Sequence, residues 1–275
     1  MSGVLLSTRA LDVSIGKICI CDALNLNVAI GERWAILGKN GVGKSTLLAT
    51  LAGLRAADAG ELHIGRISAV APTRPAGSTL GVPTFSGHDL RRLAKIRGVL
   101  TQHQSDPFPA TVLETALVGR HPHLGRWDWE STADRAIARQ ALAAVGLDDF
   151  TEREVHTLSG GERQRLAVAQ LLTQQPQLFL LDEPLTHLDL AHQVAVMNLF
   201  KKMTTDETTA TAFIAVLHDP GFAMRYCDHA LLLFGKGEWL AGRSQKIITA
   251  NNLSRLYGYP LREIRNDNDR WFIPR

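Results

Sequence analysis

Short apolar runs alternate along the chain with longer segments in which apolar residues recur every three or four positions. The apolar runs predict strands that are buried on both faces, at 34–37, 178–181 and 212–217. The three- and four-residue periodicity predicts helices at 44–54, 161–173 and 190–203. Strands and helices that alternate in this order favour an α/β fold with a largely parallel sheet covered by helices.

Two further patterns predict smaller units beside this sheet. Residues 1–33 contain short alternating runs at 17–21 and 24–30, followed by a turn at 31–32, which is typical of a small antiparallel sheet. Residues 111–146 return to helical periodicity and predict an inserted helical subdomain.

The sequence predicts a loop in one region. Residues 56–92 contain Pro72, Pro75, Pro83 and several glycines, so we expect a loop-like segment with a surface excursion at 69–86.

Composition and charge exclude several classes of protein. The chain has 275 residues, of which 45% are hydrophobic and 21% charged, which argues against disorder, collagen-like repeats and a disulfide scaffold. A formal net charge of +3 predicts no nucleic-acid partner. The three cysteines form no CxxC or Cys/His cluster, which favours a reducing compartment without structural zinc. We expect neither a membrane-spanning helix nor a signal peptide.

The loop between the first buried strand and the first helix carries a phosphate-binding motif. Residues 38–45 read GKNGVGKS and fit G-x-x-x-x-G-K-[ST]. Its glycines let successive backbone N–H groups point inward at an anion, and the helix that follows directs its positive end at the same place. Lys44 is placed to neutralise phosphate charge and the Ser45 hydroxyl to coordinate Mg²⁺. We therefore expect the chain to bind a nucleotide, against the alternative of a chance glycine turn. The expected phosphate-loop contacts are Gly38, Asn40, Gly41, Gly43, Lys44, Ser45 and Thr46.

Two carboxylates follow the strand at 178–181. Asp182 and Glu183 stand at its carboxyl end, where ligands bind in open parallel sheets. We expect Asp182 to hold Mg²⁺ and Glu183 to orient or deprotonate the attacking water.

A third motif identifies a family. Residues 158–164, LSGGERQ, resemble the LSGGQ-type signature of ATP-binding cassette ATPases and lie upstream of Asp182 and Glu183, as in that family. The resemblance implies a P-loop NTPase core that binds ATP with Mg²⁺. It also implies a head-to-tail homodimer, in which the signature residues Ser159, Gly160 and Gly161 of one subunit complete the nucleotide site of the other.

The same resemblance assigns three more residues and shows one departure. Gln102 matches the glutamine loop that reaches Mg²⁺ and the attacking water. Asp189 matches the loop that passes between subunits, and His218 matches the switch histidine that contacts the γ-phosphate. Glu183, His218 and Gln102 are therefore the expected catalytic residues, and Ser45, Gln102 and Asp182 the expected Mg²⁺ ligands. Ile15 stands where these ATPases usually place an aromatic residue against adenine.

Within the family, the chain is most similar to importer ATPases for iron-siderophore, haem and vitamin B12. The likeness rests on residues 108–112, 119–123 and 188–193. It implies a peripheral location on the cytoplasmic face of the inner membrane, polytopic permease subunits as partners, and a periplasmic or surface substrate-binding protein as an indirect partner. The docking groove is expected at 103–129, with Trp127 and Trp129 either as permease contacts or packed internally. Histidines at 103, 121, 123 and 156 lack metal-ligand spacing.

The expected layout has three parts. The nucleotide-binding core comprises residues 1–102 and 160–250, the helical subdomain with the signature comprises 103–159, and 251–275 form a short C-terminal tail without room for a regulatory domain. The alternatives are the ATPase subunit of an exporter or of another class of importer, or a soluble cassette protein of translation or DNA repair. Such translation proteins usually carry two copies of these motifs, and the repair ATPases carry long coiled-coil insertions; neither feature is present in this sequence.

Overall fold

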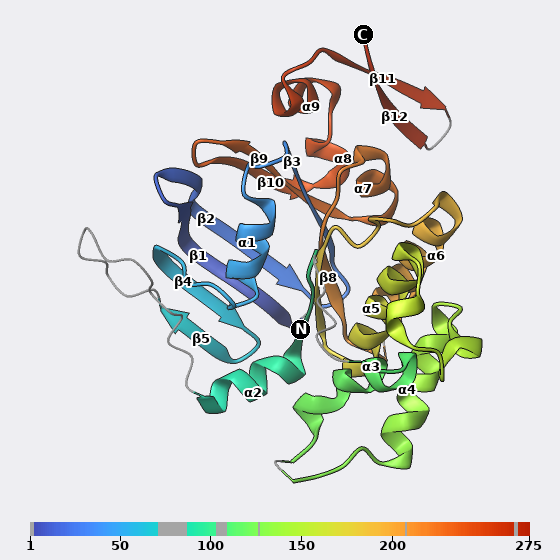
Figure 1. Ribbon diagram of the computed structural model, residues 1–275. Helices are drawn as coiled ribbons and strands as arrows, with labels where there is room; N and C mark the ends of the chain where they lie inside the picture. Colours follow the sequence, from blue (N-terminus) through green and yellow to red (C-terminus); the bar gives the residue numbers. More distant parts are fainter. Residues whose placement is uncertain (1–2, 71–86, 103–108, 126, 207, 267–268) are drawn as a thin grey trace.

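A six-stranded sheet forms the centre of the molecule (Figure 1). The computed structural model describes residues 3–70, 87–102, 109–125, 127–206, 208–266 and 269–275. Within these residues the sheet has the strand order β10-β9-β3-β8-β7-β6, parallel except for β10. Its strands are β3 (Arg33–Gly38), β6 (Arg97–Leu100), β7 (Leu178–Asp182), β8 (Ala212–Val216), β9 (His229–Gly235) and β10 (Glu238–Arg243). The predicted α/β fold with a mainly parallel sheet is confirmed.

The central strands are apolar throughout because both faces of the sheet are covered. Along β7, Leu178 and Leu180 face one hydrophobic core, whereas Phe179 and Leu181 face the other. All four side chains are fully buried. A strand buried on both faces reads as a continuous apolar run, which explains why the sequence located these strands so well.

A second, antiparallel sheet covers one face. Its strand order is β2-β1-β4-β5, and α1 lies between it and the central sheet (Figure 1). Its strands are β1 (Val4–Ile15), β2 (Ile18–Ala29), β4 (Ala59–Ile64) and β5 (Ile67–Val70).

Two expectations about this part of the chain were wrong. The two short runs at 17–21 and 24–30 belong to one strand, β2. The strand continues through the polar residues between the runs because its pairing with β1 becomes irregular near Ala23 instead of ending there. The loop expected at 56–92 contains β4, β5 and the helix α2 (Gly87–Ile96). Leu62 and Ile64 of β4 are buried against β1, a long-range pairing that local composition does not show. Of the expected excursion at 69–86, residues 71–86 lie outside the described residues.

Helices cover the faces of the central sheet. The predicted helices after β3, before β7 and before β8 are confirmed as α1, α5 and α6. The helices packed on the core are α1 (Lys44–Leu51), α5 (Gly160–Gln174), α6 (Leu190–Thr205), α7 (Pro220–Tyr226), α8 (Ser244–Ile247) and α9 (Ala250–Tyr257).

The inserted segment forms a group of helices that packs on α5. Its helical turns are α3 (Val112–Leu117), η1 (Val118–His123), α4 (Thr132–Ala144), η2 (Asp148–Phe150) and η3 (Val155–Thr157). Thr111 and Ser131 each start a helix with a reciprocal capping box, in which the hydroxyl and the acidic residue three positions later each accept a backbone N–H.

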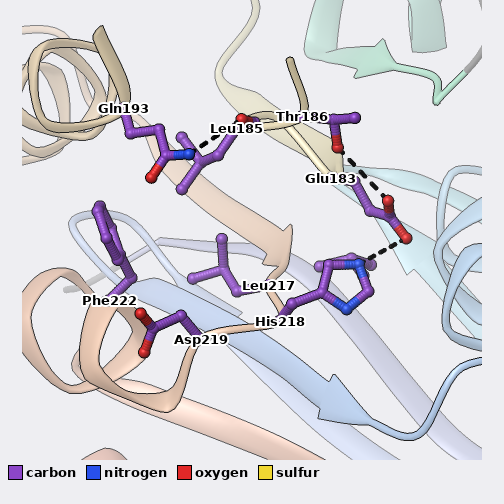
Figure 2. A pocket seen from close by; sticks show the side chains of 9 residues that line it. Glu183, Leu185, Thr186, Gln193, Leu217, His218, Asp219 and Phe222 are labelled. Atoms are coloured by element: carbon purple, nitrogen blue, oxygen red, sulfur yellow. Dashed lines mark hydrogen bonds and ion pairs between the residues drawn. The ribbon is translucent and has the colours of Figure 1, made fainter. Parts of the chain in front are cut away.

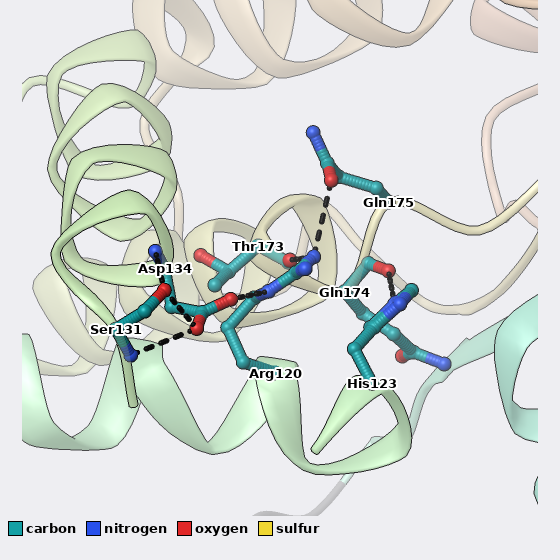
Figure 3. A network of polar contacts seen from close by, with 7 residues as sticks. All are labelled: Arg120, His123, Ser131, Asp134, Thr173, Gln174 and Gln175. Atoms are coloured by element: carbon teal, nitrogen blue, oxygen red, sulfur yellow. Dashed lines mark hydrogen bonds and ion pairs between the residues drawn. The ribbon is translucent and has the colours of Figure 1, made fainter. Parts of the chain in front are cut away.

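Arg120 forms a buried ion pair within this helical group and also links the group to α5 (Figure 3). Arg120 Nε donates to Asp134 Oδ1 at 2.7 Å, and Arg120 Nη1 donates to the Thr173 carbonyl at 3.2 Å. Hydrogen bonds from Ser131 and Arg120 lower the pKa of Asp134 to about 2. His123, one of the four histidines noted in the sequence, contacts the Gln174 carbonyl at 2.9 Å.

The segment expected as a short tail is folded. After α9, β11 (Leu261–Asn266) and β12 (Asp269–Pro274) form an antiparallel hairpin at the end of the molecule opposite α3 and α4 (Figure 1). Leu261 and Phe272 pack against the same core as α7 and α9. Among the described residues, none of the helices has the length and apolar character needed to span a bilayer.

Replacing Asp134 with Ala is expected to lower the free energy of unfolding by about 3 kcal/mol, because Arg120 stays buried without its carboxylate partner. Folding lowers the pKa of Asp134 from 3.8 to about 2, so its contribution is complete above about pH 4 and is lost as the pH falls towards 2. Denaturant unfolding between these pH values measures both effects. The exposed Asp149, changed to Ala, is the matched control. Equal stability of the two variants would contradict the expectation.

Candidate nucleotide site

Four loops meet at one edge of the central sheet. They follow β3, β6, β7 and β8, which run parallel and therefore end on the same side. The four loops carry the phosphate-loop motif, Gln102, the Asp182–Glu183 pair and His218. Ser45 and Asp182, which are 137 positions apart in the sequence, are thereby brought into direct contact.

The phosphate loop has the strained backbone that its glycines allow. Gly41 and Gly43 have φ values of 77° and 103°, a region that side chains disfavour. A Cβ at Gly43 would come within 2.6 Å of Ile20 Cδ1, so the β1–β2 hairpin packs directly on the loop. Gly43 also starts α1 without a side-chain cap, which leaves the first N–H groups of the helix for another acceptor. Asn40 is exposed in this loop, and Thr46 lies in the first turn of α1.

Lys44 is buried beneath the loop. Its Nζ donates to the carbonyl oxygens of Gly38 and Lys39, both at 3.0 Å. Burial lowers the pKa of the Lys44 ammonium, and the carboxylates of Glu183 and Asp182 oppose that shift. A cation held among carbonyls and carboxylates marks the position as one that attracts phosphate.

Ser45 and Asp182 form a pair of oxygen donors. The Ser45 hydroxyl donates to Asp182 Oδ1 at 3.0 Å, and Asp182 is buried. Burial raises the pKa of Asp182, while the hydrogen bond from Ser45 and the charge of Lys44 lower it. Hydroxyl and carboxylate oxygens are the donors that Mg²⁺ prefers, so these two side chains fit that ion.

The Glu183 carboxylate is contacted by side chains from two other loops, and Figure 2 shows the contact with His218. His218 Nε2 is 2.8 Å from Glu183 Oε1, and Gln102 Nε2 donates to Glu183 Oε2 at 3.0 Å. Glu183 has a φ of 50°, a left-handed conformation that costs a residue with a side chain about 1 kcal/mol or more. The fold therefore holds this carboxylate in an unfavourable backbone conformation, with a polar partner on each oxygen.

A cavity of about 190 Å³ opens beside Glu183 and His218. Apolar side chains of Leu185, Leu217 and Phe222 line much of it (Figure 2). Thr186 also lies there, with its hydroxyl 3.5 Å from Glu183 Oε2. The sequence reasoning missed Thr186 and Phe222. Thr186 lies three residues after Glu183, where a turn returns the chain to the carboxylate, but Phe222 arrives from α7 through tertiary packing alone.

The signature residues form a separate group. Ser159 caps α5 with a reciprocal capping box, and a Cβ at Gly161 would come within 3.0 Å of the His187 carbonyl. Asp189 caps α6 and also contacts His192 Nδ1 at 2.8 Å. Among the described residues, no hydrogen bond or ion pair joins Ser159, Gly160 or Gly161 to the phosphate loop. The structure thus brings together six of the expected residues: Lys44, Ser45, Gln102, Asp182, Glu183 and His218.

A family model described as ABC transporter matches residues 21–186, a span that contains the phosphate loop, the signature and the two carboxylates. The chain belongs to the ABC transporter family. Membership makes it an ATPase whose substrate is ATP, as the motifs predicted.

Curated relatives cover almost the whole chain. The petrobactin import ATP-binding protein FpuD of Bacillus anthracis is 34% identical over 88% of this chain and 82% of its own length. The hemin import ATP-binding protein HmuV of Burkholderia ambifaria is 35% identical over 94% of this chain and 95% of its own. The ferric enterobactin transport ATP-binding protein FepC of Escherichia coli is 33% identical over 90% and 85%.

The fold is similar to that of solved structures. An ABC transporter assigned to the metal-chelate type, in an inward-facing conformation, matches with a TM-score of 0.80 and 26% identity over 99% of this chain and 98% of that chain. The ATP-binding cassette MJ0796, in a dimeric post-hydrolysis state with ADP and phosphate, matches with a TM-score of 0.72 at 24% identity over 87% of this chain and 98% of its own, which supports the fold.

Ile15 lies at the closed end of the hairpin that packs on the phosphate loop of this ABC ATPase. It pairs with Ile18 across the turn, and its side chain is 46% exposed. The site therefore presents an aliphatic side chain at the position that the family resemblance assigns to adenine stacking.

Replacing Ile15 with Tyr is expected to tighten ATP binding about tenfold, because stacking of a base on an aromatic ring contributes roughly 1 to 3 kcal/mol. Calorimetric titration with ATP measures the dissociation constant. Val4→Tyr, at the other end of β1 and 50% exposed, adds the same ring away from the site and serves as the control. A dissociation constant that Ile15→Tyr leaves unchanged would remove the assignment of this position.

Proposed function

We propose that the chain is the ATP-hydrolysing subunit of a membrane importer for a metal chelate of the iron-siderophore, haem or cobalamin type. The observation that carries the proposal is the similarity, over most of both chains, to ATP-binding proteins for petrobactin, hemin and ferric enterobactin. The transported molecule never enters this subunit, so the site described above serves ATP and not the cargo.

The phosphate loop and its neighbours hold the nucleotide in this proposal. Backbone N–H groups of Gly41, Gly43 and the start of α1 receive the phosphates, and Lys44 neutralises their charge. Ser45, Asp182 and Gln102 would hold Mg²⁺; the fit rests on the Ser45–Asp182 contact and on the side-chain oxygens of all three residues. When bound, Mg²⁺ neutralises charge that develops on the phosphate oxygens.

Glu183 acts as the general base in the proposed mechanism. Its carboxylate accepts a proton from the attacking water, which Gln102 helps to orient. His218 contacts the same carboxylate and donates to the γ-phosphate, so it links the base to the group that is transferred. The contacts to Glu183 from two different loops keep its oxygens aimed at one point, which is what an in-line attack requires.

The proposed active form is a head-to-tail homodimer. Ser159, Gly160 and Gly161 have no contact with the phosphate loop of their own chain among the described residues, yet they form a second anion-binding surface at the start of α5. Two-fold symmetry lets each chain supply this surface to the partner, with Asp189 at the crossing between subunits. ATP binding then favours the closed pair and product release the open one.

The helical group is proposed to dock on polytopic permease subunits at the cytoplasmic face of the inner membrane. Trp127 and Trp129 are 84% and 89% exposed, which favours the permease-contact reading of these residues over internal packing. Part of the expected groove, residues 103–108 and 126, lies outside the described residues. A periplasmic or surface binding protein is an indirect partner, because it meets the permease and not this chain.

Replacing Glu183 with Gln is expected to lower ATP turnover by about 10² to 10⁴-fold, because the amide cannot accept the proton. The amide has almost the same shape and keeps a polar contact for Gln102 and His218, so ATP binding is preserved and the dimer accumulates. Steady-state phosphate release and light scattering with ATP measure the two effects. Normal hydrolysis by this variant would show that Glu183 is not the base.

The importer assignment is tested with the same variant in proteoliposomes that contain the permease encoded beside this chain and its binding protein. Uptake of a radiolabelled ferric siderophore or haem is expected with the unchanged chain and ATP, and not with Glu183→Gln. ATP-driven movement of the label in the opposite direction, from the compartment that holds ATP to the compartment that holds the binding protein, would instead support an exporter.

Replacing Ser159 with Arg is expected to abolish hydrolysis while each chain still binds ATP, because a long cationic side chain blocks closure of the two-fold interface. The change also removes a helix cap worth about 1 kcal/mol. Thr111→Arg removes an equivalent capping box at α3 and is the matched control. If Ser159→Arg retained activity, the shared-site model would be wrong.

A further inference from the structure

The last turn of α9 lies against two loops of the nucleotide site. The Tyr257 hydroxyl donates to the main-chain carbonyl of His218 at 3.4 Å. One residue later, a Cβ at Gly258 would come within 2.8 Å of Lys39 Nζ. Lys39 is the second residue of the phosphate loop, and His218 contacts the Glu183 carboxylate. A single helix end thus touches both the phosphate-binding loop and the loop of the switch histidine.

The helix is anchored firmly enough to hold these contacts. Leu253 and Leu256 of α9 are fully buried in the core beside the central sheet. The Arg255 guanidinium lies over the Phe234 ring of β9, 4.3 Å from its centroid. Packing on both sides therefore limits the movement of α9 relative to the strands that carry the site.

The C-terminal hairpin secures the end of α9. The Leu261 N–H donates to Ser254 Oγ at 2.8 Å. Arg270 donates to the Ile248 carbonyl at 3.2 Å and forms a bidentate ion pair with Glu263. The hydrogen bonds from Arg270 lower the pKa of Glu263 to about 2. The hairpin, α8 and α9 consequently form one connected unit.

Tyr257 is suited to act as a permanent donor. Its side chain is half-buried, and burial together with the charge of Asp219 raises the pKa of the hydroxyl to about 12. The hydroxyl therefore keeps its proton at neutral pH. Its acceptor is a main-chain carbonyl, so it restrains the peptide that carries the His218 imidazole without competing for the ring nitrogens.

We propose that the end of α9 is a positioning element for ATP hydrolysis, with Tyr257 holding the His218 main chain and Gly258 making room for Lys39 of the phosphate loop. The inference rests on the proposed catalytic roles of His218 and Glu183. It gives the C-terminal unit a role in ATP turnover. The sequence does not indicate this role, because the unit is distant in sequence from every nucleotide-binding motif.

The two contacts predict different effects. Loss of the Tyr257 hydroxyl loosens His218, which acts in the chemical step, so Tyr257→Phe is expected to lower kcat about three- to tenfold with little change in KM. Gly258 has a φ of +69°, and Ala there adds a Cβ against Lys39. Lys39 Nζ is the end of a flexible side chain that can turn away, so Gly258→Ala, strained by its positive φ, is expected to lower Tm while changing the KM for ATP by less than about threefold.

The experiment compares these variants with matched controls in the full-length chain. Tyr259→Phe removes a hydroxyl from a 53% exposed ring two residues away. Gly31→Ala places a Cβ at a similar φ of +84°, where it meets the Thr204 carbonyl at an ordinary 3.7 Å. Steady-state ATPase kinetics and thermal unfolding are measured for all four variants, with Glu183→Gln alongside.

Hydrogen exchange of residues 216–222 provides a readout that does not depend on activity. Faster exchange in Tyr257→Phe than in Tyr259→Phe, together with a kcat that falls while KM is nearly unchanged, supports the inference. Kinetics and exchange in Tyr257→Phe equal to those of Tyr259→Phe would overturn it, as would a fall in Tm with kcat unchanged. Normal hydrolysis by Glu183→Gln would instead overturn the proposed catalytic role of Glu183, so the two failures are distinguishable.

Discussion

Parallel hydrogen bonding between β3, β8, β7 and β6 brings the carboxyl ends of four strands to one edge of the sheet, and the nucleotide site depends on that arrangement. Each strand ends in a loop with one chemical function: anion binding after β3, an amide after β6, two carboxylates after β7 and an imidazole after β8. The strands are apolar and buried on both faces, so their relative positions are set by core packing. Precision at the site is thereby a consequence of the rigidity of the core.

The conformation of Glu183 lowers the stability of the fold at this edge of the sheet. Its backbone adopts a left-handed conformation, and its carboxylate is held between Gln102 and His218. Lys44 and Asp182 are likewise buried, with burial shifting the pKa of each towards its neutral form and the opposite charge of the other restraining that shift. Such a cluster is costly in the absence of a ligand that satisfies it, as expected for a site that binds a charged nucleotide.

The two surfaces for which a function is proposed lie at opposite ends of the molecule. The helical group, tied to α5 by the hydrogen bond from Arg120 to the Thr173 carbonyl, carries the exposed Trp127 and Trp129. The C-terminal unit lies at the opposite end and contacts the nucleotide loops through the end of α9 (Figure 1). Because α5 begins at the signature serine, movement of the helical group relative to the sheet would move the surface offered to the partner subunit. The proposed coupling of ATP hydrolysis to the permease uses this connection.

The sequence by itself determined the α/β class, most of the central strands and helices, and the identity of the phosphate loop, the carboxylates and the signature, because these features are local: apolar runs, periodicity and short motifs each describe one segment. It did not reveal β4 and β5, whose burial arises from pairing with distant strands, or the placement of Phe222 beside Glu183. Gln102 and His218 became meaningful only through the family resemblance, and only the tertiary structure brought both onto the Glu183 carboxylate. The same holds for the last 25 residues, which composition indicated as a tail: long-range packing of α9 and its hairpin places Tyr257 against His218, a contact no local pattern encodes.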